Sequence, residues 1–368
     1  MIALPSPSAD AVDQAIAGAI DRIRDRAGAL GGAFPALGDA ISRAATGGKR
    51  FRPALVVASF DAFGGDATAS TALYPVAAAF ELLHTAFVVH DDVIDHDTVR
   101  RGIPNVSGEF RARARERGAD DAGAALLGDA AGILAGDLLL HEAGRLIALA
   151  DVDAARRAAL LDVIDDAIYV SAAGELADVE HAVEEDCAAS DELLSAAHDK
   201  TAVYSFTAPL CAGALLAGAS DDALAALHRA GGRLGLAFQL ADDLIGAFGS
   251  EAQAGRESGG DLREAKRTPL IAFARESESW HRVNDALAVA HTGPIAVGEA
   301  QRLLDDSGAR VRLLALIDGT LAQAQRGRGR GAKGVKFGLK ARMCIHPPLR
   351  HVQKPISLRR QPEAFPAA

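Results

Sequence analysis

Apolar residues recur at spacings of three and four along several long stretches of the chain. This is the period of a helix with one buried face, whereas a half-buried strand alternates apolar and polar residues at every second position. Alternating runs of that kind are hard to find, and the stretches are separated by Gly or Pro, which interrupt helices. The pattern predicts an all-α helical bundle, with helices over residues 74–94, 124–149, 155–179 and 224–248.

The composition allows a large core and predicts no membrane span. The 368 residues are 49% hydrophobic, so a sizeable interior is expected. The longest apolar stretch, 206–219, is shorter than the roughly 20 residues that cross a bilayer, and Glu81 and His84 interrupt the other candidate. Because the chain starts without a secretory signal and its three cysteines show no paired spacing, we expect a reduced, cytoplasmic protein.

Charge is distributed unevenly along the chain. From Arg326 onward there are eleven Lys or Arg and one Glu, a net charge of +10, so the preceding residues carry −20 of the total of −10. A body this acidic argues against nucleic-acid binding, which needs a basic surface. The Arg-Gly alternation at 326–331 and the absence of a helical stripe predict a disordered basic tail over 326–368, after a helical domain over 1–325.

The first candidate for chemistry is the acidic sequence Asp91-Asp92-Val-Ile-Asp95 at the end of an apolar helix. Residues at i and i+4 share a helix face, so Asp91 and Asp95 can bind the same cations while Asp92 points partly aside. Crowded carboxylates repel one another, and a divalent metal removes that repulsion. The alternative is a solvated acidic helix end. His84 and Phe87 lie on the helix face that ends at Asp91, as in a pocket with an apolar floor. Ordinary core packing would also explain Phe87.

Two basic clusters flank this acidic sequence. The first is Gly47-Gly48-Lys49-Arg50-Phe51-Arg52, and the second is Arg100-Arg101-Gly102. Glycine exposes backbone donors, and arginine presents a planar fork of N–H groups to phosphate oxygens, so each cluster suits a diphosphate. Basic clusters are more often plain surface. Here they flank an acidic cluster of the kind that binds metal, and a metal–diphosphate ligand needs both charges.

A second acidic cluster, Gln239-Leu-Ala-Asp242-Asp243-Leu-Ile-Gly246, also lies on an apolar helix. It repeats the adjacent aspartates but has glycine where a third carboxylate would stand. Lys200-Thr201 and Lys266 are the remaining candidates, although a single lysine is more often a surface residue.

Taken together and in this order, these segments resemble the trans-prenyltransferases, also called isoprenyl diphosphate synthases, from about residue 47 to 268. The resemblance implies antiparallel helices around a deep cavity, with the two aspartate-rich motifs facing each other across its mouth. It implies condensation of isopentenyl diphosphate with an allylic diphosphate, and a homodimer. In this family, bulk before the first motif closes the cavity floor. Phe87 supplies bulk but Ala86 does not, so we expect geranylgeranyl diphosphate as product, with farnesyl diphosphate next.

The resemblance also implies a metal site for the allylic diphosphate. Magnesium would be the cofactor, with three ions bridging to this diphosphate and with Asp92 and Asp243 in support. The magnesium ligands implied by the motifs are Asp91, Asp95 and Asp242. The cations that would neutralise the same diphosphate are Arg100, Lys200 and Lys266.

Further positions match the family's second substrate site and cavity wall. Thr201 and Gln239 would face the reacting carbons. Gly174-Glu175 with Asp178 resembles another motif that lines the cavity. The residues that match the isopentenyl diphosphate site are Gly48, Lys49, Arg52, His84 and Arg101.

Two departures and two alternatives accompany the resemblance. Gly246 replaces the last acidic residue of the second motif, which should weaken secondary metal contacts and leave activity intact. The basic tail does not match the family's ending.

An ionising terpene cyclase also uses an aspartate-rich motif, but it has no second diphosphate for Arg52 or Arg101 to bind. A non-catalytic partner subunit would have no need of Asp91, Lys200 or its other intact site residues.

Overall fold

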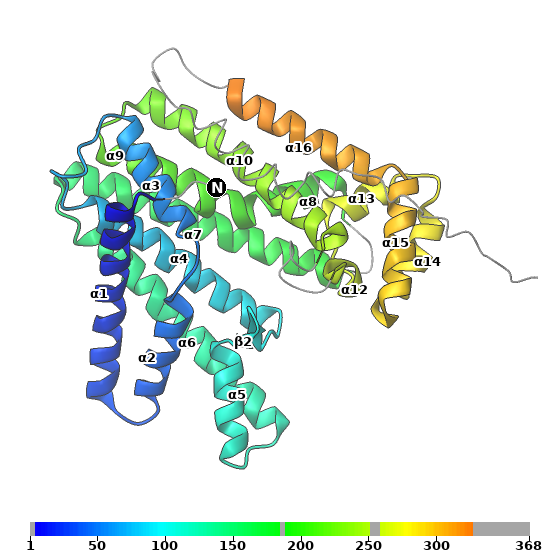
Figure 1. The fold of residues 1–368 in the computed structure, drawn as a ribbon, viewed down its shortest axis with the longest axis horizontal. Helices are drawn as coiled ribbons and strands as arrows, with labels where there is room; N and C mark the ends of the chain where they lie inside the picture. Colours follow the sequence, from blue (N-terminus) through cyan, green and yellow to red (C-terminus); the bar gives the residue numbers. More distant parts are fainter. Residues whose placement is uncertain (1–3, 185–187, 251–257, 327–368) are drawn as a thin grey trace, which may run out of the picture. The chain divides into compact units, whose positions relative to one another are not determined.

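The computed structural model describes residues 4–184, 188–250 and 258–326, which are mostly helical (Figure 1). The prediction of an all-α fold is confirmed. The two short strands of the described part are β1 (Val99–Arg100) and β2 (Ile103–Pro104). The α-helices are α1 (Ser6–Leu30), α2 (Phe34–Ala45), α3 (Phe51–Ala62), α4 (Leu73–Ile94), α5 (Val106–Glu116), α6 (Asp121–Ala148), α7 (Ala154–Val183), α8 (Ser190–Ala197), α9 (Ala208–Leu216), α10 (Asp221–Phe248), α12 (Gly260–Arg263), α13 (Pro269–Arg275), α14 (Trp280–Ala288), α15 (Pro294–Asp306) and α16 (Ala309–Arg326). A π-helix, η1 (His198–Thr207), joins α8 to α9, and a 3-10 turn, η2 (Ala290–Thr292), precedes α15.

The chain forms two compact units. Among the described residues, unit 1 comprises 4–178, 195–236 and 320–326, and unit 2 comprises 179–184, 188–194, 237–250 and 258–319. The four helices predicted from apolar periodicity correspond to α4, α6, α7 and α10. Helix α16 ends at Arg326, so residues 327–368 of the predicted tail lie outside the described residues, and the tail stays a prediction.

Helix α4 lies at the centre of unit 1, packed against α1, α3 and α6. Leu73, Phe80 and Leu83 on α4 and Leu139 on α6 have no exposed surface. By length and composition alone, α4 and α6 are apolar enough to cross a membrane, and 67% of the apolar stretch of α4 is buried inside the protein. Burial of this stripe positions the carboxyl end of α4, where the first acidic cluster stands.

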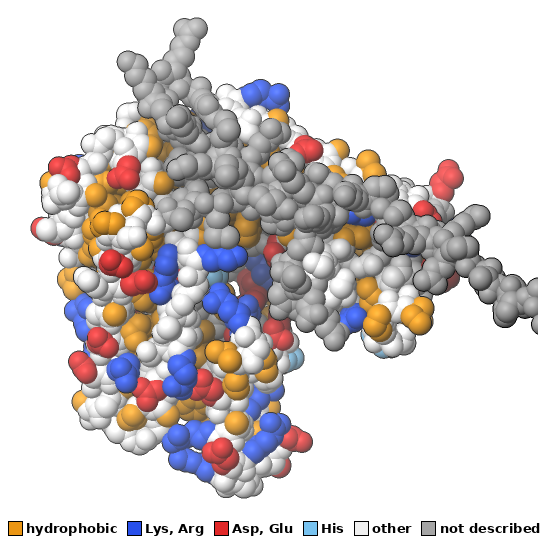
Figure 2. Space-filling view, viewed as in Figure 1, with side chains coloured by type: hydrophobic (Ala, Val, Ile, Leu, Met, Phe, Trp, Pro, Cys, Tyr) orange, Lys and Arg blue, Asp and Glu red, His pale blue; other side chains and the backbone are white. Residues whose placement is uncertain are grey.

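Ion pairs cover the surface near α5. Arg111 Nη2 lies 2.8 Å from Asp129 Oδ1, and Arg115 Nη2 lies 2.9 Å from Asp121 Oδ1. Figure 2 shows blue and red side chains interspersed over this end of unit 1. The Arg115–Asp121 pair is exposed and contributes only about 0–1 kcal/mol, whereas the Arg111–Asp129 pair is partly buried.

A tight hairpin presents the second basic cluster. Val99 pairs with Pro104 and Arg100 with Ile103, which leaves Arg101 and Gly102 as the turn. Both turn residues have positive φ, 54° and 80°, as a two-residue turn of the primed type requires. The predicted Arg-Arg-Gly cluster is therefore a hairpin that projects Arg101 at its tip and keeps Arg100 in the ladder.

The π-helix η1 packs unusually close to its neighbours because they carry glycine. A Cβ atom on Gly174 of α7 would lie 2.1 Å from the backbone nitrogen of Lys200, and one on Gly235 of α10 would lie 2.4 Å from the Cα of Ala202. No side chain fits at these distances. Glycine on α7 thus lets η1 approach until the Lys200 side chain meets the carboxylates of α7 and α4.

Replacing Gly174 with alanine should destabilise the protein by about 1–3 kcal/mol, because the new methyl group forces α7 and η1 apart. The matched control is Gly144→Ala in α6, where nothing lies within 4 Å of the added Cβ. This control should stabilise by about 0.5–1 kcal/mol through helix propensity. Urea unfolding of both variants tests the comparison, and equal shifts would contradict the packing argument.

Candidate active site

The carboxyl end of α4 carries the first acidic cluster. Asp92 is only 4% exposed and accepts hydrogen bonds from Nε (2.8 Å) and Nη2 of Arg100 in β1. Burial raises the pKa of Asp92, and its ion pair with Arg100 offsets part of that rise. Asp91 is half-buried, with its Oδ2 3.6 Å from the same guanidinium, while Asp95 is exposed at the C-terminal cap of α4. Asp92 therefore holds Arg100 in place, and Asp91 and Asp95 form the outward edge of the cluster.

Lys200 of η1 lies among three carboxylates. Its Nζ is 2.8 Å from Asp178 Oδ2, 3.0 Å from Glu175 Oε1 and 3.4 Å from Asp91 Oδ1. Asp178 and Glu175 come from α7 and Asp91 from α4, so this ammonium joins three helices of unit 1. The sequence motifs at these positions, which lie far apart along the chain, meet at a single cation.

The electrostatics keep Lys200 charged. Burial alone would lower the pKa of its ammonium, but the charges of Asp178, Asp91 and Glu175 outweigh burial and raise the pKa above its ordinary value. Burial raises the pKa of Glu175, partly opposed by Lys200. A lysine that stays protonated cannot act as a general base at neutral pH. It can only hold and neutralise negative charge.

A second group of side chains surrounds Tyr204, one turn further along η1. Arg52 of α3 donates from Nη2 to Ser205 Oγ (2.8 Å) and to Tyr204 Oη (3.3 Å), and its guanidinium lies 4.9 Å from the Tyr204 ring centroid. The Tyr204 ring also meets Phe87 edge-on at 4.9 Å and stacks with His84 at 6.1 Å. Arg52, His84 and Phe87, predicted for different roles, thus share one aromatic neighbour.

Two buried polar atoms in this group have no hydrogen-bond partner in the described part of the chain: Nδ1 of His84 and Nε of Arg52. Burial, followed by the positive charges of Arg52, Arg100 and Arg101, lowers the pKa of His84 well below its ordinary value. The imidazole is therefore neutral at pH 7. A neutral ring donor beside arginines, with polar atoms unsatisfied, suits an anionic ligand, because buried polar groups normally find partners.

The predicted glycine–lysine loop lies before α3. Gly47 and Gly48 have positive φ, 76° and 91°, and Lys49 is exposed. The neighbouring Arg50, which the sequence did not single out as a site residue, is the structural cation of this loop, since it pairs with Asp13 at 2.8 Å and Glu81 at 3.2 Å. Lys49, by contrast, is at the surface.

The second acidic cluster lies in unit 2 on the last turns of α10. Asp242 is exposed, whereas Asp243 is 9% exposed and accepts a hydrogen bond from Gln239 Nε2 at 2.8 Å. Lys266 Nζ lies 3.4 Å from Glu264. The first and second acidic clusters belong to different units, so the prediction that they face each other across a cavity stays a prediction.

The chemistry of the donor set fits magnesium together with phosphate better than magnesium alone. Asp91 and Asp95 offer hard oxygen ligands one helical turn apart, as Mg²⁺ prefers. Within the described residues, however, no three His, Cys, Asp or Glu side chains come together as a ready-made metal site. Mg²⁺ commonly takes one or two carboxylates and completes its shell with water and substrate phosphate. The clusters suit that mode of binding.

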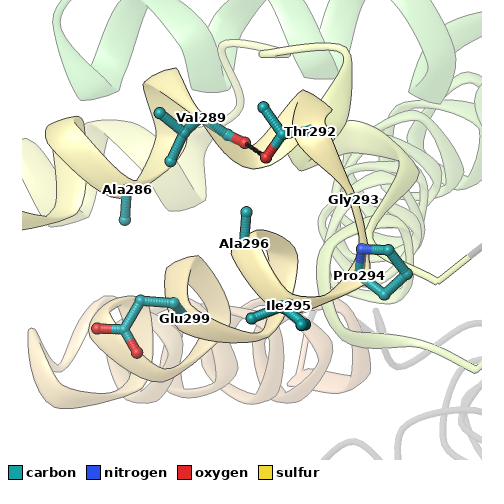
Figure 3. Close-up of a pocket in the computed structure, with 8 residues that line it drawn as sticks. All are labelled: Ala286, Val289, Thr292, Gly293, Pro294, Ile295, Ala296 and Glu299. Atoms are coloured by element: carbon teal, nitrogen blue, oxygen red, sulfur yellow. Dashed lines mark hydrogen bonds between the residues drawn. The ribbon is translucent and has the colours of Figure 1, made fainter.

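An apolar surface pocket of about 440 Å³ lies in unit 2 between α14 and α15 (Figure 3). Thr292 Oγ1 donates to the carbonyl of Val289 there, and the single carboxylate, that of Glu299, pairs with Arg302. None of the predicted site residues lines this pocket. It has no group positioned for the chemistry discussed here.

Sequence reasoning missed Tyr204 and Ser205. Tyr204 follows Lys200 by four residues, so helical periodicity could have placed it on the same side of its helix. Ser205 carried no such signal, because its role depends on the contact with Arg52 of α3. Asp178 and Glu175 were identified by resemblance, and their shared ion pairs with Lys200 became visible only in three dimensions.

Comparison with known proteins places these residues in a family context. A family model described as polyprenyl synthetase matches residues 35–326. A geranylgeranyl diphosphate synthase of Sulfolobus acidocaldarius is 34% identical over 228 residues, 61% of this chain and 62% of the relative. A (2E,6E)-farnesyl diphosphate synthase of Mycobacterium tuberculosis is 35% identical over 263 residues, 72% of this chain and 63% of the relative. The chain thus matches slightly less than two thirds of the length of these relatives.

A solved structure shares the fold over nearly the whole length. The geranylgeranyl pyrophosphate synthase of Corynebacterium glutamicum, complexed with isoprenyl diphosphate and magnesium, superposes with a TM-score of 0.80 at 25% identity, covering 94% of this chain and 98% of that one. The polyprenyl synthase of Caulobacter crescentus, complexed with calcium and isoprenyl diphosphate, gives a TM-score of 0.65 at 29% identity over 89% and 92%.

Replacing Lys200 with methionine should destabilise the ligand-free protein by about 1–3 kcal/mol, because three carboxylates lose their shared cation. Since Asp178 is about half exposed, the lower part of that range is expected. Magnesium chloride should raise the melting temperature of this variant more than that of the wild type. Thermal unfolding with and without the salt is the measurement. Lys266→Met, which removes a more exposed lysine, is the control and should change stability by less than about 1 kcal/mol.

Proposed function

We propose, because this chain belongs to the polyprenyl synthetase family, that it is a magnesium-dependent prenyltransferase that condenses isopentenyl diphosphate with allylic diphosphates. Its product is a short-chain all-trans prenyl diphosphate, geranylgeranyl diphosphate first and farnesyl diphosphate next. The curated relatives with these two names support this range of products. The observation that carries the proposal is the meeting of Lys200, Arg100 and Asp91 at the end of α4. A homodimer, predicted from the resemblance, and a cytoplasmic location, predicted from the cysteine spacing, are part of the same proposal.

Asp91 and Asp95 on α4, together with Asp242 on α10, would hold the magnesium ions, three in number by resemblance. When bound, magnesium stabilises the negative charge that develops on the departing diphosphate. Two solved relatives contain magnesium or calcium with isoprenyl diphosphate, which supports a divalent metal here.

The cations of the chain would bind the allylic diphosphate. Arg100 is oriented by Asp92, and Lys200 is held by carboxylates of α7 and α4. Because the raised pKa keeps Lys200 protonated, its contribution is electrostatic stabilisation of the leaving group. Lys266 would contribute a third positive charge. Loss of the diphosphate then leaves an allylic cation on the substrate.

A separate set of donors would bind isopentenyl diphosphate. Arg52 is fixed by Ser205 and Tyr204, so its fork of N–H groups is oriented before the ligand arrives. The neutral imidazole of His84 supplies a hydrogen bond, and Gly48, Lys49 and Arg101 come from the two loops that carry positive φ. The double bond of this substrate attacks the allylic cation, and a proton is lost to the released diphosphate.

The aromatic residues would enclose the growing chain. Phe87 and Tyr204 meet edge to face, which forms an apolar wall that excludes water from the cation. Buried Thr201 and the half-buried Gln239 would face the reacting carbons. Ala86 has a small, fully buried side chain and adds no bulk to this wall. Phe87 is therefore the bulky residue expected to limit product length.

Purified protein with magnesium should convert farnesyl diphosphate and isopentenyl diphosphate to a C20 product. Chromatography of the dephosphorylated products, with dimethylallyl, geranyl and farnesyl primers side by side, is the measurement. Asp91→Ala should lower turnover by orders of magnitude, because a ligand to the diphosphate complex is lost. Asp25→Ala, an exposed aspartate of α1, is the matched control. A cyclic hydrocarbon formed without isopentenyl diphosphate would instead identify a terpene cyclase.

Replacing Phe87 with alanine should lengthen the product, because the wall opposite Tyr204 is opened. Phe87→Met keeps most of the volume and should retain the wild-type distribution. The chain lengths of dephosphorylated products are compared for the three proteins. An unaltered distribution in the alanine variant would contradict the assignment of Phe87.

A further inference from the structure

Tyr204 of η1 contacts residues that have two different proposed roles. Its hydroxyl oxygen accepts a hydrogen bond from Nη2 of Arg52 at 3.3 Å, and its ring meets the ring of Phe87 edge-on, with 4.9 Å between the centroids. Arg52 is the cation proposed to bind isopentenyl diphosphate, and Phe87 is the residue proposed to limit product length. One tyrosine therefore joins the two groups, through its hydroxyl on one side and its ring on the other.

Packing of η1 holds the backbone around Tyr204. A Cβ atom on Gly235 of α10 would lie 2.4 Å from the Cα of Ala202, two residues before the tyrosine, and Ser205, the residue after it, is only 1% exposed. Because this backbone has little room to move, the tyrosine ring is positioned chiefly by the side chains around it. These side chains are Phe87, Arg52 and His84, whose ring stacks with that of Tyr204 at 6.1 Å.

The hydrogen bond to Tyr204 helps to orient the guanidinium of Arg52. Nη2 donates to Ser205 Oγ at 2.8 Å and to Tyr204 Oη at 3.3 Å, whereas the buried Nε has no hydrogen-bond partner in the described part of the chain. An arginine binds phosphate through a planar fork, so the orientation of that plane decides how many N–H groups reach the ligand. Loss of the tyrosine hydroxyl would remove one of the two acceptors that hold Nη2 and would let the plane turn.

We infer that Tyr204 is a positioning residue that couples the proposed product-length wall to the proposed isopentenyl diphosphate site. The Phe87 ring holds the tyrosine ring and the tyrosine hydroxyl holds Arg52, so a change at the wall alters the affinity for isopentenyl diphosphate. The inference rests on the proposed function and deepens it. The competing explanation is that Tyr204 only fills space between α3, α4 and η1.

Tyr204→Phe removes the hydroxyl and keeps the ring. Calorimetric titration of isopentenyl diphosphate into the full-length variant should show an affinity about 2- to 10-fold weaker than that of the wild type, as expected for one hydrogen bond. With farnesyl diphosphate as primer, KM for isopentenyl diphosphate should rise by a similar factor, whereas kcat should change less. The matched control is Tyr169→Phe, an exposed tyrosine of α7, which should change neither quantity.

A double-mutant cycle tests the coupling itself. Phe87→Ala frees the tyrosine ring and should weaken binding of isopentenyl diphosphate by up to about 10-fold, the range expected for an aromatic pair. In the Tyr204→Phe background the same change should have no further effect on this affinity, because the hydroxyl that carries the coupling is absent. Ser205→Ala also removes an acceptor of Arg52 but leaves the aromatic pair intact, so its effect should add to that of Phe87→Ala.

The outcomes separate the two proposals. Unchanged affinity in Tyr204→Phe, with or without a lower melting temperature, would show a space-filling role and overturn the inference alone. Effects of Tyr204→Phe and Phe87→Ala that simply add would also overturn it. If the wild type neither binds isopentenyl diphosphate nor extends farnesyl diphosphate, the proposed function itself fails.

Discussion

The ammonium of Lys200 is the charge on which the rest of the site depends. Three carboxylates from α4 and α7 converge on it, and without a cation their mutual repulsion would drive these helix segments apart. Close packing of η1 against Gly174 gives the lysine its position. The backbone of η1 thus fixes the position of Lys200, and side chains of α4 and α7 supply the carboxylates around its ammonium.

Two further cations of unit 1 are also held by neighbouring side chains. Arg100 is engaged by Asp92, and Arg52 by Ser205 and Tyr204, so two of the cations proposed to bind phosphate are oriented by the protein in the absence of ligand. A site whose donors are already oriented loses less entropy when the ligand binds. Carboxylates therefore have two different places in the site: Asp92 is buried and orients Arg100, whereas Asp95 is exposed.

Apolar periodicity predicted α4, α6, α7 and α10 well, because each has a long buried stripe that dominates its sequence. The resemblance implied that Asp91 and Lys200 serve the same diphosphate, which stays a prediction, and the structure adds that the two side chains form an ion pair at 3.4 Å. Periodicity could not predict that residues 198–207 form a π-helix, since its i→i+5 pattern has no separate signature in composition. Periodicity also could not predict that Asp261 of α12 packs against Gly246 of α10, where an added Cβ atom would lie 1.7 Å from Oδ2 of Asp261. That contact depends on the close approach of Gly259 to Val297 of α15, which positions α12.

The π-helix also limits how this stretch of chain can vary in length. Removing one residue from a helix rotates the side chains before that point relative to those after it. Removing one residue between Lys200 and Tyr204 would therefore turn the ammonium away from α7 if Tyr204 and Ser205 kept their contacts with Arg52. Insertions and deletions in η1 would therefore separate the two substrate-binding groups in rotation, even where every motif residue was retained.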